Sequence, residues 1–148
     1  MMRLLSLISL LLLPTTVTAT ETLSIDNLWV RAAPPHMKMT AAYGELGNNN
    51  VDPVSVVSVS TSITDRASIH ETQLRNDRAM MRPVTALSIA PGQQVTLEPG
   101  GLHLMLMELS TPLEIGQSID ICFMLDTGDS VCAEAEIRRQ AMHGEHHQ

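Results

Sequence analysis

The sequence has very few aromatic residues. Only Trp29, Tyr43 and Phe123 are aromatic among 148 residues, so the core must be built from Val, Leu, Ile, Ala and part of the ten methionines. Recognition of bases or sugars by stacking on aromatic side chains therefore has little to work with. A chain of 148 residues can bury one ordinary core and is short for two domains of typical size, so we expect a single domain.

Basic residues are also scarce. The chain has 9 Lys and Arg against 16 Asp and Glu, which gives a formal net charge of −7. No basic cluster stands out against this average, and an acidic surface repels nucleic-acid phosphates and anionic lipid. We therefore expect no nucleic-acid partner.

Long apolar runs are absent except at the start of the chain. The run Leu4–Leu13 precedes the small-residue pattern Val17-Thr18-Ala19, which is typical of a secretory signal peptide and its cleavage site. A run of about ten residues falls short of the roughly 20 that a membrane-spanning helix needs. We expect a signal peptide at 1–19, a domain at 20–139 and a flexible tail at 140–148, with no stable membrane insertion after cleavage. An uncleaved anchor is the alternative.

Short alternating or β-branched runs separated by turn residues indicate an all-β chain. No long helical period appears. The expected strands cover residues 22–32, 41–47, 54–60, 67–74, 94–98, 102–109, 117–125 and 130–137. Eight short strands of this kind are typical of a Greek-key β-sandwich.

The last pair of strands can be given a register. A three-residue loop, Asp126-Thr127-Gly128, would place glycine at the left-handed position that such loops favour. Leu125 then faces Asp129, and counting back pairs Cys122 directly with Cys132. Two cysteines opposite each other in an exported chain favour a structural disulfide. A redox-active or metal-binding thiol pair is the alternative.

Four soft or borderline metal ligands have a distinctive spacing. Ten residues separate His70 from Met81, 21 separate Met81 from His103, and one separates His103 from Met105. On a strand, His103 and Met105 point to the same face. We expect His70 and Met81 to come from a neighbouring strand and the turn that follows it.

This set of two imidazoles and two thioethers favours Cu(I), because neutral sulfur donors are soft ligands. The absence of carboxylates makes it a poor site for zinc, calcium or magnesium. Each residue alone has a plainer explanation, since methionine often fills gaps in cores and a single histidine on a strand is usually structural. The four together favour a copper site.

The spacing and its surroundings resemble the periplasmic copper chaperones of the PCu(A)C family. The resemblance covers roughly Leu23 to Arg139. It includes Trp29-Val30-Arg31-Ala32 with Pro34-Pro35, Ile69-His70-Glu71, Met81-Arg82-Pro83-Val84, Pro91-Gly92 to Pro99-Gly100-Gly101, and Leu102-His103-Leu104-Met105-Leu106-Met107.

The resemblance implies a cupredoxin-like β-sandwich, which we expect to be monomeric. It implies that His70, Met81, His103 and Met105 hold Cu(I) at an accessible site and that the ion passes to partner proteins. In the family, those partners are linked to assembly of the copper centres of cytochrome c oxidase, often alongside a thioredoxin-like copper protein.

The chain departs from the family pattern in a few places. The cysteine pair is extra, and the cluster His36-Met37-Lys38-Met39 is expected to be an exposed loop, with an auxiliary copper contact as the alternative. Met107 shares the alternation of His103 and Met105, and we expect it to belong to an apolar rim. The tail contains Met142, His143, His146 and His147. Its imidazoles could capture Cu(II), with Met142 available to Cu(I), and the alternative is that the tail only keeps this end of the chain soluble.

Three other classes of protein compete with this interpretation. A blue-copper electron carrier needs a thiolate clustered with two imidazoles, but the nearest histidine after Cys132 is His143 in the tail. An enzyme is disfavoured because the cysteines lack the C-x-x-C spacing and no Gly-x-Ser-x-Gly motif occurs. A metal-free structural or adhesion sandwich would leave the ligand spacing unexplained.

Overall fold

The computed structural model describes residues 22–139, all of whose regular structure is β. Its ten strands are β1 (Leu23–Arg31), β2 (Met39–Asn48), β3 (Val54–Thr61), β4 (Arg66–Arg75), β5 (Arg78–Pro83), β6 (Leu87–Ile89), β7 (Gln94–Leu97), β8 (Leu102–Met107), β9 (Ser118–Leu125) and β10 (Ser130–Arg138). Within this range no helix could cross a membrane. The expected signal peptide and the 140–148 tail lie outside the described residues.

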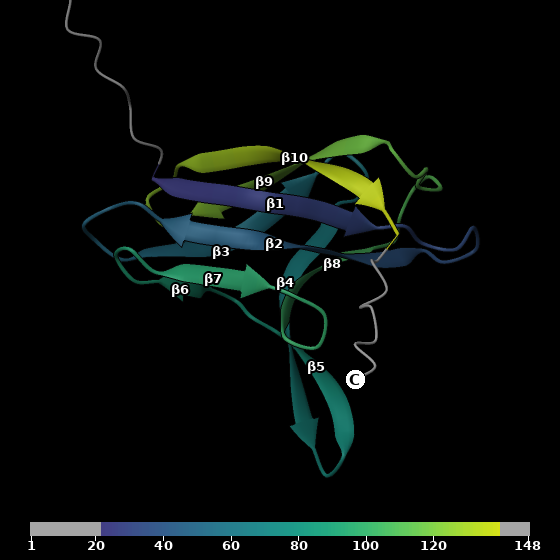
Figure 1. Cartoon of the computed structure of the whole chain (residues 1–148), viewed down its shortest axis with the longest axis horizontal. Coiled ribbons are helices and arrows are strands. Elements are labelled where there is room, and N and C mark those ends of the chain that lie inside the picture. Colours follow the sequence, from purple (N-terminus) through teal and green to yellow (C-terminus); the bar gives the residue numbers. More distant parts are fainter. Residues whose placement is uncertain (1–21, 140–148) are drawn as a thin grey trace, which may run out of the picture.

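The strands form one continuous sheet that folds over on itself (Figure 1). Its order is β5-β4-β8-β2-β1-β10-β9-β3-β6, and β7 pairs with β2 beside β8. The β1 and β10 strands run parallel, whereas the other pairs are antiparallel. The predicted all-β, cupredoxin-like sandwich is confirmed. The β4–β5 hairpin projects from the body of the domain (Figure 1).

The core lies between the inward faces of the folded sheet. Strict alternation on β9 buries Ile121 and Phe123, both 0% exposed, while Cys122 between them faces outward. On β8 the same alternation buries Leu104 and Leu106 completely. Met105, between those leucines, and His103 and Met107 on either side of them therefore point to the other face of the sheet.

The β9–β10 hairpin has the predicted register. Cys122 pairs with Cys132 and Phe123 with Val131, and Gly128 has the left-handed φ of 91° that the loop requires. The two cysteines form a disulfide. Its place on the outer face means that it joins the two strands without entering the core.

Two strands were not expected from the sequence. The prediction that Met81 lies in a turn after β4 is wrong, because Met81 belongs to β5, which pairs with β4 through a two-residue turn. That turn, Asn76-Asp77, has positive φ values of 49° and 60°, as tight hairpins prefer. The second, β6, is only three residues long and pairs with β3 at one end of the sheet.

Strand β1 contains a bulge that brings it close to β2. The register shifts between Asp26 and Trp29, and Asn27 adopts a φ of 51°. Gly44 of β2 faces this bulge, where a Cβ atom would lie 3.0 Å from the Asp26 carbonyl oxygen and 3.0 Å from the Leu28 Cα. The close approach of two backbones explains the glycine.

Candidate metal centre

The sheet register brings the four predicted ligands onto one face. His70 of β4 lies directly opposite His103 of β8, and Met105 follows two residues later on the same face of β8. Met81 of β5 lies opposite Thr72, which is two residues from His70 on β4. Because paired residues of antiparallel strands share a face, side chains from three strands converge on the outer surface of the β5-β4-β8 segment.

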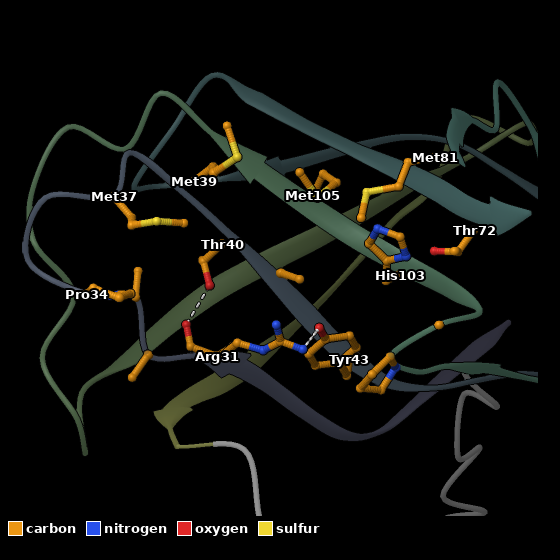
Figure 2. A pocket seen from close by; sticks show the side chains of 15 residues that line it. Arg31, Pro34, Met37, Met39, Thr40, Tyr43, Thr72, Met81, His103 and Met105 are labelled. Carbon is orange, nitrogen blue, oxygen red and sulfur yellow. Dashed lines mark hydrogen bonds between the residues drawn. The ribbon is translucent and has the colours of Figure 1, made fainter. Parts of the chain in front are cut away.

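Three of the four predicted ligands line a common cavity of ≈ 440 Å³. Figure 2 shows the side chains of Met81, His103 and Met105 gathered on one side of it. His70 does not line this cavity, but its ring centroid lies 6.2 Å from that of His103. The structure thus groups Met81, His103 and Met105 directly and holds His70 beside them.

The hydrogen bonds of His103 fix which of its nitrogens is free. The ring is 4% exposed, and its Nδ1 lies 3.0 Å from the carbonyl oxygen of Gly101. A carbonyl can only accept, so Nδ1 carries the proton and the neutral ring keeps a lone pair on Nε2. That Nε2 is buried and has no hydrogen-bond partner. The Gly101 carbonyl also accepts the Thr72 N–H at 3.1 Å, which holds the carbonyl in place.

His70 shows the same pattern with its nitrogens exchanged. Its Nε2 is hydrogen-bonded to the Ser68 hydroxyl at 3.0 Å. When the hydroxyl accepts the ring proton, the lone pair lies on Nδ1, which is buried without a partner. Burial lowers the pKa of His70 below its usual 6.5, and the positive charge of a protonated His103 lowers it further. Both effects favour the neutral imidazole, the form that binds a metal.

The chemistry of the surrounding donors excludes hard cations. No carboxylate lines the cavity, and Arg31, held by a hydrogen bond to the Tyr43 hydroxyl, is its one permanently charged residue. In residues 22–139, no three His, Cys, Asp or Glu side chains converge on a point that could hold a metal. A metal at this place must therefore use thioethers, which select soft ions such as Cu(I).

The cavity also contains Met37 and Met39, which were expected in an exposed loop. That expectation is wrong for Met39, which is the first residue of β2. Met37 and Met39 line the cavity wall (Figure 2), and they are 52% and 48% exposed. Their neighbours His36 and Lys38 line a separate hollow. The signal was present in the sequence, because the spacing of Met37, Met39 and Ala41 continues the alternation of β2 outward into the loop.

Comparison with known sequences identifies the family of this chain. Residues 23–137 match the family described as "LpqE-like: Putative lipoprotein LpqE-like". A relative from Leifsonia xyli subsp. xyli, named "Putative lipoprotein Lxx21020", is 34% identical over 107 residues. The match covers 72% of this chain and 63% of that relative, so the chain spans less than two thirds of the relative's length.

Solved structures share the fold. The apo PCuAC domain of PmoF1 has a TM-score of 0.68 at 23% identity and covers 83% of this chain and 98% of its own. The copper-bound PCuAC domain of PmoF2 has a TM-score of 0.69 at 19% identity, and the match covers 83% of this chain and 97% of that domain. The solution structure of Cu(I)-DR1885 from Deinococcus radiodurans has a TM-score of 0.64 at 29% identity, and the match covers 79% of this chain and 80% of that protein. The chain therefore belongs to the LpqE-like family, and its predicted resemblance to PCu(A)C domains is confirmed in its fold.

Proposed function

We propose that the protein is an exported copper chaperone that holds Cu(I) through His70, Met81, His103 and Met105 and hands it to partner proteins. The observation that carries the proposal is the pair of buried, unpartnered ring nitrogens, His70 Nδ1 and His103 Nε2. A buried acceptor without a hydrogen bond costs about 1–3 kcal/mol. Two of them on neighbouring strands, next to thioethers, are explained if a cation completes their bonding.

The exposure of the ligands suits transfer rather than permanent storage. Met81 is 58% exposed on the projecting hairpin, whereas His103 is nearly buried. A partner's ligand can therefore displace the Met81 thioether first, while His103 still holds the ion. Such exchange needs no change of oxidation state, because thioether and imidazole are both neutral donors.

Cu(I) as the cargo is supported by the donor set and by the relative from Deinococcus radiodurans, which is described in its Cu(I) form. As partners we propose copper-receiving proteins such as a thioredoxin-like copper protein or subunits of cytochrome c oxidase. Export to the periplasm is supported by the N-terminal sequence pattern and by the lipoprotein description of the family. The projecting β4–β5 hairpin is the part of the site that a partner can reach.

An electron carrier of the blue-copper kind is the second candidate on fold grounds. It requires a cysteine thiolate as copper ligand. Both cysteines of the chain are joined in the Cys122–Cys132 disulfide, so neither can supply one. The chaperone function is therefore favoured.

The proposal is tested by anaerobic Cu(I) titration of the mature chain, from residue 20, against a competing chelator. We expect one tight equivalent, and we expect Met81→Leu and His103→Leu each to weaken it by tenfold or more, about 1.4 kcal/mol or greater. Met124→Leu is the matched control, because Met124 is 38% exposed on β9 and does not line the cavity. Unchanged affinity in both site variants would refute the ligand assignment.

A further inference from the structure

The row of thioethers continues beyond the proposed ligands. Met107 is the next residue after His103 and Met105 on the outer face of β8. Met39, the first residue of β2, lies directly opposite Met107, and Ala41 lies opposite Met105. Directly opposite residues have Cβ atoms only about 4.5–5.5 Å apart. Two thioethers therefore adjoin each other one step along the sheet from the His/Met set.

Met37 supplies a third thioether beside Met39, at the edge of the cavity next to Met107, which does not itself line the cavity. Met37 lines the cavity together with Met39 and Met105, and Figure 2 shows these three methionines side by side along the cavity, with Met81 and His103 beyond them. The Met37 N–H is bonded to the Pro34 carbonyl at 2.9 Å, which closes a turn of the loop and holds Met37 over the cavity.

Packing does not account for these side chains. A methionine that fills a gap in a core is buried, yet Met37 and Met39 are about half exposed. Three positively charged residues adjoin these methionines. Arg31 lines the same cavity, Lys38 stands between Met37 and Met39 in the chain, and Arg66 lies opposite Met107 on β4. The Arg66 guanidinium is 3.4 Å from the Glu108 carboxylate, so its positive charge is offset locally. The thioethers themselves are neutral, soft donors, and those of Met37 and Met39 are accessible.

We propose that Met37, Met39 and Met107 form a second Cu(I) position, built only of thioethers, beside the His/Met set. Met105 lies between the two positions, two residues from His103 and two from Met107 on the same strand face. The ion moves between them by ligand exchange, in which one sulfur binds as another leaves and copper stays as Cu(I). The inference rests on the proposed function, because it takes the His/Met set as the tighter position.

The position can be observed by NMR of the mature chain with ¹³C-labelled methionine methyl groups, titrated anaerobically with Cu(I). The first equivalent is expected to shift the methyl signals of Met81 and Met105. The second equivalent is expected to shift those of Met37, Met39 and Met107.

Two methionines outside the site serve as internal references. Met80 lies on the opposite face of β5 from Met81, and Met124 lies on β9, so neither signal is expected to move. If the second equivalent shifts only Met142 of the tail, or leaves Met37, Met39 and Met107 unmoved, the second position does not exist.

A paired set of variants separates this inference from the proposed function. Met37→Leu/Met39→Leu is expected to abolish the second equivalent and leave the affinity for the first unchanged, and Met80→Leu/Met124→Leu is expected to change neither. Retention of the second equivalent in the Met37/Met39 variant would overturn the inference alone. If the first equivalent does not shift Met81 and Met105, the proposed His/Met site fails, and the thioether position fails with it as a secondary site.

Discussion

Replacing His103 by leucine should stabilise the metal-free protein while weakening its Cu(I) binding by tenfold or more. His103 is 4% exposed, and its Nε2 has no partner in the metal-free fold. A leucine of similar size removes that unsatisfied acceptor and keeps the space filled. A residue selected for metal binding at the expense of stability gives this signature, whereas a structural histidine does not.

The magnitude follows from the hydrogen bonds. Removing a buried, unpartnered acceptor relieves about 1–3 kcal/mol, and losing the Nδ1–H bond to the Gly101 carbonyl costs about 0.5–1.5 kcal/mol. The Gly101 carbonyl keeps one hydrogen bond, because the Thr72 N–H still donates to it at 3.1 Å. The expected result is a gain of about 1 kcal/mol in the free energy of unfolding of the apo protein.

Urea unfolding with and without Cu(I) measures both effects. Free Cu(I) at 100 times the wild-type Kd should stabilise the wild-type chain by about 2.7 kcal/mol and the His103→Leu variant by about 1.4 kcal/mol or less. His36→Leu, in an exposed loop outside the cavity, is the control and should change neither quantity. A loss of 1 kcal/mol or more in the apo His103→Leu protein would refute the reasoning, since it would make His103 a structural residue.

Three further predictions concern pH, the disulfide and the sheet. Burial lowers the pKa of His70 below 6.5 in the folded chain, so near that pH the unfolded chain binds more protons than the folded one. The stability of the apo protein should therefore be full above pH 6.5 and fall as the pH drops below it. His70→Asn should remove this part of the pH dependence in urea unfolding. Replacing both Cys122 and Cys132 by alanine should cost about 2–3 kcal/mol, given their separation of 10 residues. Cu(I) affinity, measured by chelator competition, should not change, and a large loss would tie the disulfide to the site. Gly44→Ala should destabilise the fold by about 1–3 kcal/mol, because its Cβ would meet the β1 backbone at 3.0 Å; thermal unfolding at the wild-type midpoint would contradict this.

The parts of the fold that depend on local sequence could be predicted. The β9–β10 register followed from the position of Gly128 and from side-chain alternation, and the Cys122–Cys132 disulfide followed from the register. Strand β5 was missed because all six of its residues are exposed, so it has no apolar alternation to detect. The two-residue turn at Asn76-Asp77 was the remaining signal, and its asparagine and aspartate are residues that tolerate positive φ.

The site was only partly predictable for a different reason. The alternation of β8 placed His103 and Met105 on one face, but the pairing of His70 with His103 joins strands that are far apart in sequence. Such pairing depends on the whole sheet closing, which no local pattern specifies. For the same reason, the position of Met39 opposite Met107 could not be seen from the sequence, and the loop was judged by its composition alone.

X-ray absorption at the copper K-edge of the mature chain loaded with one equivalent of Cu(I) tests the central claim most directly. The account predicts a Cu(I) edge and a first shell of mixed nitrogen and sulfur, from His70, His103, Met81 and Met105. In Met81→Leu, one sulfur should be lost while both nitrogens remain. A shell of sulfur alone, or of nitrogen and oxygen without sulfur, would contradict the assignment of the four ligands.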